Sequence, residues 1–328
     1  MKINIIYPLT SNPNGGGNQF LRALRTEFIR KGMYSEMEEA DIILFNSHQN
    51  VTPVIKARQK NLNAIFVHRI DGPIRMYNKM SDRRDDIVYA LNNRIADATV
   101  FQSEYSKRAN IELQCPRQQF ETVILNSSDL NIFYPMPGKT KDFSNDKVRI
   151  IATSFSDNWK KGFKTYQWLD EHLDFDRYEM VFVGKSPCEF RNIKMLGVMN
   201  SFDLAEQLRQ SDVFITASQN ECCTNSLIEA ICCGLPSLAI NSGGNVEIIK
   251  TRNGGLLFDK AEEVPDKLDD IVKHYSDMRN ALLVIGVDKV AAEYLTFFQN
   301  LIDEHEAGHL ALKKIKWRDA LYFRWIGR

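Results

Sequence analysis

Short apolar runs alternate with amphipathic stretches along most of the chain. The runs are four to seven residues long and rich in β-branched and aromatic residues, which is typical of strands buried in a parallel sheet. Glycine, proline and polar residues separate them from segments with the spacing of amphipathic helices. The repeated order of strand and helix predicts an α/β fold with parallel sheets. The strands are expected at residues 2–7, 41–45, 64–68, 99–102, 148–154, 178–184, 193–197, 212–218 and 236–241.

The chain is long enough for about two domains, each with its own core. A turn-rich passage at residues 126–137 is followed by the polar stretch 138–147, and apolar runs flank the two. This composition is typical of a domain boundary, so the interdomain linker is expected at 138–147. Each half has the pattern of a doubly wound α/β domain, and we expect the two domains to face one another across a cleft.

Basic and acidic residues are equal in number, at 42 each, so no overall field would draw the chain to nucleic acid. No run of about 18 apolar residues could span a bilayer. The opening residues are interrupted by polar ones too soon for a signal peptide. The expected compartment is the cytoplasm.

Four of the six cysteines form two adjacent pairs, Cys222 with Cys223 and Cys232 with Cys233. Neither pair has the spacing of a zinc site or of a C-x-x-C redox motif. We interpret them as small buried hydrophobic residues in a reducing compartment. A redox or metal-binding role is the alternative.

Two carboxylates, Glu221 and Glu229, stand out in the second half of the chain. Residues 212–218 read as a buried strand, and Thr224 is a good N-cap for a helix that Gly234 would end. Glu221 is then expected in the loop after the strand, and Glu229 about one and a half turns into the helix. Both carboxylates would reach the crevice at the carboxyl ends of the strands, where open α/β sheets bind ligands.

Glycine and lysine motifs indicate two sites for an anion. Gly15, Gly16 and Gly17 follow the first strand, where backbone N–H groups at the start of a helix could approach a phosphate. Their spacing is not G-x-G-x-x-G, which argues against a nicotinamide cofactor. Lys160 and Lys161 lie at the start of another helix, where the dipole disfavours a cation unless an anion is bound. The alternatives are a flexible glycine turn and two solvated lysines.

A polar group follows the strand expected at 64–68. It consists of His68, Arg69, Asp71 and Arg75, and a glycine and a proline break the chain within it. We interpret these four residues as the lining of a pocket at the carboxyl end of the strand. The alternative is a loop in which Asp71 pairs with Arg69 or Arg75.

The two glutamates also belong to a longer pattern. Seven residues separate them, and the second opens an E-A-x-x-x-G-x-P motif made by Glu229, Ala230, Gly234 and Pro236. Five further motifs occur in order along the chain. They are Gly15 to Gly17, the hinge-like stretch 126–135, Lys161 with Gly162, Val183 with Gly184, and Gly243 and Gly244 with Glu247.

This pattern resembles the retaining nucleotide-sugar glycosyltransferases of the GT-B fold, in family 4, and the resemblance spans residues 1 to about 260. It implies two facing Rossmann-like domains, with the acceptor side at 1–138 and the nucleotide-sugar side at 147–286. The C-terminal helices of 287–328 would cross back to the first domain.

The implied activity is that of a hexosyl or other glycosyltransferase, in the EC 2.4 class. The donor would be a nucleoside diphosphate-sugar, and the acceptor a glycan, a lipid-linked sugar or a small molecule. The resemblance implies front-face attack that retains the anomeric configuration, with the lysine serving in place of a metal and with no cofactor.

Each site residue then takes an implied role. Lys161 and the helix start at 224–226 would stabilise the leaving diphosphate. Glu229 would accept hydrogen bonds from the ribose, and Glu221 from the transferred sugar. The catalytic residues would be Glu221, Lys161 and Asp71, with His68, Arg69, Asp71 and Arg75 on the acceptor side. The donor-binding residues would be Gly15, Gly16, Gly17, Ser156, Lys160, Lys161, Glu221, Thr224, Asn225, Ser226 and Glu229.

Two departures from the family pattern keep other functions open. Residues 154–156 replace a G-R pair, so one phosphate cation is missing, and Lys160 is the expected substitute. The usual E-G-F-G is here E-C-C-T at residues 221–224, which would narrow the sugar pocket. The alternatives are a catalytically decayed nucleotide-sugar-binding module and a GT-B-like sugar-nucleotide epimerase.

The chain closes with an amphipathic helix expected at 290–301 and a basic, aromatic segment at 313–328. Such a segment can lie on an anionic membrane, so peripheral contact at the inner face of a membrane is expected. The alternative is a helix that packs its aromatic residues on the first domain. The segment contains Lys313, Lys314, Lys316, Trp317, Arg318, Tyr322, Phe323, Arg324, Trp325 and Arg328, with Asp319 as its one acid.

Overall fold

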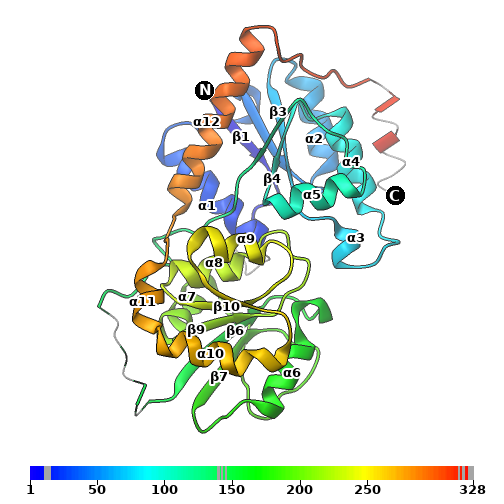
Figure 1. Cartoon of the computed structure of the whole chain (residues 1–328). Helices are drawn as coiled ribbons and strands as arrows, with labels where there is room; N and C mark the ends of the chain where they lie inside the picture. The colour runs from blue at the N-terminus through cyan, green and yellow to red at the C-terminus, as the bar shows by residue number, and fades with distance from the viewer. Residues whose placement is uncertain are drawn as a thin grey trace. The chain divides into compact units, whose positions relative to one another are not determined.

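The computed structural model describes residues 1–10, 16–138, 141, 143–144, 146–316, 318–319 and 322–323. The chain folds into two compact units (Figure 1). The division comes after Asn126, ahead of the linker expected at 138–147, and the C-terminal residues belong with the N-terminal ones. Unit 1 comprises Met1–Leu9, Leu21–Asn126 and Val287–Arg328, and unit 2 comprises Thr10–Phe20 and Ser127–Gly286.

Unit 1 is built, in the described residues, on a five-stranded parallel sheet with its strands in chain order. Every residue of the first four strands is buried, which agrees with their almost wholly apolar sequences. The fifth strand was not predicted, because it is short and its residues are only half-buried. The strands are β1 Ile3–Ile6, β2 Ile42–Asn46, β3 Ile65–Ile70, β4 Ala98–Phe101 and β5 Phe120–Val123.

Helices pack against this sheet in two groups. One group, α2 and α4, places apolar side chains in a core with Phe45 and Phe66. The other consists of α1 and α12, which lie beside one another in Figure 1 and bring the rings of Phe28 and Phe298 within 6.2 Å. α12 confirms the amphipathic helix expected at 290–301. The helices are α1 Gly16–Arg30, which begins in unit 2, α2 Val51–Lys60, α3 Ile74–Tyr77, α4 Arg84–Arg94, α5 Glu104–Glu112 and α12 Val287–Glu306.

A buried ion pair holds the segment after α12 against the rest of unit 1. Arg58 Nη1 lies 3.1 Å from Asp97 Oδ2, and both side chains are almost fully buried. Arg58 Nε donates to the Lys313 carbonyl oxygen (2.6 Å), and Lys313 N donates to Asp97 Oδ1 (2.8 Å). The Lys313 ammonium donates to Gln118 Oε1 (2.7 Å), and burial lowers the pKa of Lys313 to about 8. Lys313 was expected to face a membrane, but its ammonium group forms a hydrogen bond inside unit 1.

Two aromatic residues of the predicted membrane segment also pack on unit 1. Phe323 is buried in the core shared by α2 and α4. The Arg94 guanidinium lies 4.3 Å from the ring centre of Tyr322. At these positions the aromatic side chains adopt the alternative that the sequence left open. Trp317, Arg324, Trp325 and Arg328 lie outside the described residues.

Unit 2 is built on a parallel sheet with the order β11-β10-β9-β6-β7-β8 in the described residues. The chain runs from β6 outwards to β8, and then returns to the other side of β6 for β9 to β11. Open α/β sheets bind ligands at the carboxyl ends of the strands where the order reverses in this way. A ligand site is therefore expected at the carboxyl ends of β6 and β9. The strands are β6 Val148–Ser154, β7 Tyr178–Gly184, β8 Lys194–Gly197, β9 Val213–Thr216, β10 Ser237–Ile240 and β11 Gly255–Phe258.

An apolar core lies between this sheet and the helices α6 and α10. Phe163 of α6, Phe182 of β7 and Leu268 of α10 are fully buried members of it. The helices of unit 2 are η2 Trp159–Lys161, α6 Phe163–His172, α7 Ser201–Gln210, α8 Asn225–Cys232, α9 Asn245–Arg252, η3 Ala261–Glu263, α10 Val264–Lys273 and α11 Tyr275–Ala281.

Candidate functional site

An ion pair joins the loops that follow β6 and β9 in unit 2. Lys161, the last residue of η2, donates from Nζ to Glu221 Oε1. Both side chains are only partly exposed, at 20% and 17%. A cation and a carboxylate thus lie together at the strand reversal, where the two predicted motifs were expected to meet.

Close backbone packing holds the Lys161 loop in place. Gln219 N donates to the Lys160 carbonyl oxygen (2.8 Å), which ties this loop to the one after β9. Gly162 has a φ of +90°, and a Cβ there would lie 2.3 Å from the Cβ of Ala217. Glycine is needed for both reasons, because it tolerates positive φ and leaves room for Ala217.

Gly243 and Gly244 position the other member of the pair. Gly244 N donates to the Glu221 carbonyl oxygen (2.8 Å). A Cβ at Gly243 would lie 2.5 Å from that oxygen, and one at Gly244 would lie 2.2 Å from the Cys222 carbonyl oxygen. The glycine pair therefore lets the loop after β10 pack directly on the backbone that carries Glu221.

α8 begins after Thr224, as predicted, but Thr224 does not cap it with its side chain. The Thr224 hydroxyl donates instead to Asn245 Oδ1 (2.6 Å), and Asn245 Nδ2 donates to the Ser218 carbonyl oxygen (3.0 Å). Tertiary contact has replaced the local bond that the sequence favours. At the other end Gly234, with a φ of +81°, closes the helix as expected.

Glu229 lies inside α8 and is buried, with 8% of its surface exposed. Burial raises the pKa of Glu229 to about 8, because the apolar surroundings disfavour the charged form. Hydrogen-bond donors from a ligand would favour the charged form and lower this pKa. The surroundings of Glu229 therefore favour its uncharged form.

The glycine motif of the first strand reaches the start of α8. Gly16 and Gly17 form the first turn of α1 within unit 2, whereas Gly15 lies outside the described residues. A Cβ at Gly16 would lie 2.2 Å from Asn225 Nδ2, so only glycine allows this approach. Further along α1, Gln19 Nε2 donates to Ser201 Oγ at the start of α7.

The remaining predicted donor residues flank these groups. Ser156 lies in the loop after β6, where its hydroxyl accepts from Asn158 N (3.2 Å). Lys160 and Ser226 are partly exposed, and Ser226 lies in the first turn of α8. The structure thus brings Lys160, Lys161, Gly162 and Glu221 into linked loops, with Gly16 beside the start of α8.

The predicted acceptor-side residues of unit 1 are placed differently. β3 extends to Ile70, two residues further than expected, so His68 and Arg69 lie within the strand. His68 is fully buried, stacks on Phe45 with ring centres 4.4 Å apart, and places Nε2 3.0 Å from the Ser47 carbonyl oxygen. Burial lowers the pKa of His68 to about 4. The prediction that His68 emerges at the strand end is wrong, because β3 continues through Ile70 and His68 lies inside it.

Asp71 does follow the strand, and it pairs with Arg69. Arg69 Nη1 lies 3.0 Å from Asp71 Oδ1, and Arg69 Nη2 donates to Asn126 Oδ1 (2.7 Å). Asn46 Nδ2 donates to Asp71 Oδ2 (3.1 Å), and the Asp71 side chain remains 33% exposed. Arg75 turns away and pairs with Asp86. The sequence left this Arg69–Asp71 pairing open as an alternative.

His48 is a candidate that the sequence analysis missed. It follows β2 in a loop where Ser47 and Asn50 both have positive φ, at 38° and 56°. Non-glycine residues rarely adopt this conformation, and they cluster at functional sites. Its Nδ1 is buried, with no hydrogen-bond partner in the part of the chain described, and Ser47 Oγ accepts from Asp71 N (3.0 Å).

The surroundings of His48 keep it neutral. Burial and the Arg84 guanidinium lower the pKa of His48, against the opposing effect of Asp71 and the two carboxylates of Asp82 and Asp85. A polar run directly after an apolar strand was the sequence signal for this residue.

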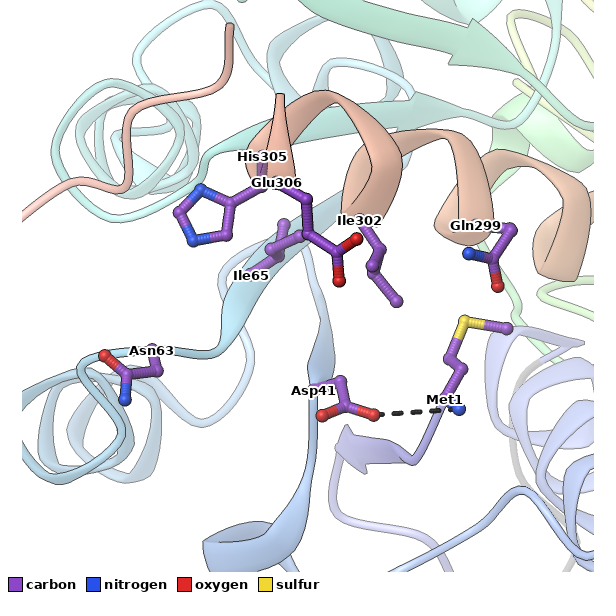
Figure 2. A pocket seen from close by; sticks show the side chains of 8 residues that line it. All are labelled: Met1, Asp41, Asn63, Ile65, Gln299, Ile302, His305 and Glu306. Carbon is purple, nitrogen blue, oxygen red and sulfur yellow. Dashed lines mark ion pairs between the residues drawn. The ribbon is translucent and has the colours of Figure 1, made fainter. Parts of the chain in front are cut away.

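A separate hollow of about 470 Å³ lies in unit 1 at the amino ends of β2 and β3 (Figure 2). Asp41 and Ile65 come from the sheet side, and Ile302 and Glu306 come from α12. It lies at the opposite ends of the strands from Asp71, and no predicted site residue lines it. The other lining residues are Met1, Asn63, Gln299 and His305.

Among the described residues, no group of three His, Cys, Asp or Glu side chains could hold a metal ion. No helix among them is long and apolar enough to cross a membrane. All six cysteines lie in the described ranges and none forms a disulfide; four are buried, and Cys188 and Cys222 are half-buried.

One family model matches the part of the chain that carries the ion pair. Residues 174–283 match the model described as "Glycosyl transferases group 1". The match lies within unit 2 and includes Glu221, Glu229 and the glycine pair at 243–244. Comparison with the curated proteins finds no match.

Solved structures are similar over most of the chain. HepE from Anabaena, in a complex with UDP-glucose, is 16% identical over 94% of this chain and 100% of its own, with a TM-score of 0.64. A sucrose-phosphate synthase from Thermosynechococcus elongatus is 17% identical over 90% and 82%, with a TM-score of 0.62. A glycosyltransferase from Rickettsia africae is 17% identical over 90% and 84%, with a TM-score of 0.59. At these identities the likeness shows the fold, which is the predicted GT-B fold.

Proposed function

We propose that the protein is a retaining glycosyltransferase that moves a hexosyl or other glycosyl group from a nucleoside diphosphate-sugar to a glycan, a lipid-linked sugar or a small molecule. The ion pair between Lys161 and Glu221 carries the proposal, since it places a cation and a carboxylate at the strand reversal of unit 2. The match of residues 174–283 to group 1 glycosyl transferases and the UDP-glucose complex of the similar HepE support it.

Lys161 would stabilise the leaving diphosphate. Negative charge grows on the phosphate oxygens as the bond from the sugar breaks, and a fixed cation aimed at that charge lowers the barrier. The ammonium has three donor hydrogens, so it can keep its bond to Glu221 and still donate to a phosphate oxygen. Glu221 would both orient Lys161 and accept hydrogen bonds from hydroxyls of the transferred sugar.

Glu229 would bind the ribose of the donor. Two neighbouring ribose hydroxyls can donate to the two oxygens of one carboxylate, which favours its charged form. Its raised pKa means that donor binding near neutral pH is accompanied by release of a proton from Glu229. The helix start at Asn225 and Ser226, with Gly16 beside it, would face the phosphates.

The transfer step follows a front-face course in this proposal. The bond between the anomeric carbon and the phosphate oxygen breaks, and the acceptor oxygen forms a new bond to the anomeric carbon from the same face. The acceptor proton passes to the departing phosphate oxygen, so no side-chain base, metal or cofactor is required. The anomeric configuration is therefore retained.

Unit 1 would supply the acceptor side through Asp71. Arg69 and Asn46 hold the Asp71 carboxylate in place, and the part of this carboxylate that remains exposed can accept a hydrogen bond from a hydroxyl of the acceptor.

We place the enzyme in the cytoplasm, at the inner face of a membrane. Lys314, Lys316 and Arg318 are exposed and would contact anionic lipid headgroups, whereas Lys313 would not.

A donor panel with acceptors tests the proposal. Purified protein would be incubated with UDP-, GDP- and ADP-sugars and a panel of glycans, lipid-linked sugars and small sugars. Mass spectrometry would detect transfer, and NMR would assign the new anomeric configuration. Binding without turnover would favour a decayed module, and conversion of the donor without an acceptor would favour an epimerase. Absence of both binding and turnover would reject a sugar-nucleotide function.

A further inference from the structure

Phe155 and Lys185 lie side by side at the carboxyl ends of two neighbouring strands of unit 2. Phe155 is the first residue after β6 and Lys185 is the first after β7. Lys185 Nζ lies 5.1 Å from the ring centre of Phe155, within the range of a cation–π contact. The ring is 43% exposed, so the pair forms a surface of one aromatic face and one positive charge at the ligand-binding edge of the sheet.

The backbone holds these two residues together. Lys185 N donates to the Ser154 carbonyl oxygen (2.9 Å), immediately before Phe155. Gly184 has a φ of +118°, and a Cβ there would lie 1.8 Å from the same oxygen. Glycine at this position is therefore a condition for the close approach of the two loops.

The loop that begins with Phe155 leads directly to Lys161. Hydrogen bonds within it fix its course, since Ser154 Oγ donates to the Ser156 carbonyl oxygen (2.6 Å) and Lys160 N donates to Asn158 Oδ1 (3.0 Å). The loop ends at Lys161, whose ammonium group forms an ion pair with the Glu221 carboxylate. Lys185 differs from Lys161, because its ammonium has no carboxylate partner among the residues described.

We propose that Lys185, held over the ring of Phe155, is a second cation for the diphosphate of the donor, acting beside Lys161. The inference rests on the proposed function and deepens it. The diphosphate of a sugar nucleotide carries two negative charges, whereas the charge of Lys161 is already partly offset by Glu221. Residues 154–156, at the carboxyl end of β6, contain no basic residue. Lys185, which follows the neighbouring strand β7, would supply the positive charge that is missing there.

Phe155 has a positioning role in this arrangement. A free lysine side chain has many rotamers, and ordering it costs conformational entropy when a ligand binds. The aromatic face reduces that cost by keeping the ammonium near the strand ends before binding.

Calorimetric titration of the full chain with UDP, GDP, ADP and inorganic pyrophosphate tests the inference. Lys185→Gln is expected to weaken the best-bound nucleotide and pyrophosphate about tenfold, which is the size of one charge-assisted contact. Lys185→Arg should retain most of the affinity, and Phe155→Ala should weaken it by a smaller factor. The matched nucleoside without phosphate should bind equally to wild type and Lys185→Gln. Lys273→Gln removes the same charge from the exposed end of α10 and should have no effect.

The outcomes separate this inference from the proposed function. If wild type binds a nucleotide and Lys185→Gln binds it equally well, the inference is overturned and the proposed function stands. An equal loss for the nucleoside would also overturn it, because Lys185 would then contact the base and not the diphosphate. If wild type binds none of the nucleotides or pyrophosphate, both proposals fall together. Thermal unfolding of each variant serves as the folding control, and an exposed lysine and a half-exposed ring are expected to leave it unchanged.

Discussion

Lys161 and Glu221 are sixty residues apart in the sequence and form one ion pair in the structure. Each belongs to a loop that leaves the carboxyl end of a different strand, and the two strands, β6 and β9, are neighbours in the sheet. Most of the surface of both side chains is shielded from water, so the attraction between their charges is stronger than in an ion pair on an open surface.

Lys161→Ala is expected to slow glycosyl transfer by about a hundredfold or more, because the diphosphate loses a preorganised cation. Glu221→Gln should abolish most transfer while leaving UDP affinity within a few fold, since in the proposed function Glu221 would contact the transferred sugar and not the phosphates. Steady-state kinetics with UDP titrations check both effects. Lys164→Gln, an exposed lysine of α6, is the matched control. Wild-type turnover in Lys161→Ala would remove Lys161 from the mechanism.

Glu229 makes stability depend on pH in a defined direction. In the unfolded chain the carboxyl ionises near its ordinary pKa of 4.5, but in the folded chain it stays protonated up to about 8. The folded state therefore binds more protons in this interval, and the free energy of unfolding falls as pH rises from about 4.5 to 8, by at most about 1.4 kcal/mol per unit. Denaturant titrations at several pH values would measure the slope. Glu229→Gln should reduce it, and an identical slope in the variant would contradict the prediction.

The same carboxyl couples donor binding to protons. If ribose hydroxyls stabilise charged Glu229, the affinity for a bound donor such as UDP-glucose increases as pH rises towards 8, and binding releases protons. Calorimetry in buffers with different ionisation enthalpies would count these protons. Glu229→Gln should bind with a flat pH profile. A proton release of the same size in this variant would assign the effect to another group.

Gly162→Ala tests whether the turn before α6 must be glycine. The added Cβ would meet Ala217 at 2.3 Å while the residue keeps a φ of +90°, so we expect a loss of stability of about 1–3 kcal/mol together with weaker nucleotide binding. Gly197→Ala is the control, because Gly197 also has positive φ, at +74°, but has no atom within 4 Å of an added Cβ. Equal effects of the two changes would show that φ alone, and not packing under Lys161, matters.

His48→Phe is expected to separate stability from activity. The change removes a buried nitrogen that has no partner among the described residues, so the melting temperature should remain unchanged or rise. His48 follows Ser47, whose hydroxyl accepts from Asp71 N, so the change lies beside the proposed acceptor-side carboxylate and should slow transfer while UDP binding stays constant. Asp86→Asn, which alters a neighbouring carboxylate that pairs with Arg75, is the control. A clear drop in melting temperature would mean that the imidazole stabilises the fold.

Asp97→Ala is expected to destabilise unit 1 by about 3–5 kcal/mol, because it leaves the Arg58 guanidinium buried without its counter-charge. It also removes the bond that fastens Lys313, so limited proteolysis should release the C-terminal segment faster. Glu39→Ala breaks an exposed pair with Lys2 and should change neither measurement appreciably. Wild-type resistance to proteolysis in Asp97→Ala would show that the remaining contacts, among them those of Lys313 with Arg58 and Gln118, are sufficient to hold the segment.

The sequence by itself determined the parallel strands and most of the donor motif. Apolar runs such as residues 178–184 are typical of strands in a sheet covered on both faces, and their short length and β-branched and aromatic composition favour a strand over a helix. The helix that carries Glu229 could also be predicted from the sequence, because its start and its stop at Gly234 depend on neighbours in the chain. β5 and β11 were missed, since four half-buried or glycine-bounded residues give too weak a local signal.

Only the tertiary structure decided which side chains meet. His68 was predicted at a strand end but lies in the core, because β3 continues for two further residues and is buried along its whole length. The contact of Gly16 with Asn225 and the approach of Lys185 to Phe155 join segments that follow different strands. Such contacts depend on strand order and on backbone distances of a few ångströms. Hydrophobic periodicity specifies neither, because it records which face is buried and not which strand lies next in the sheet.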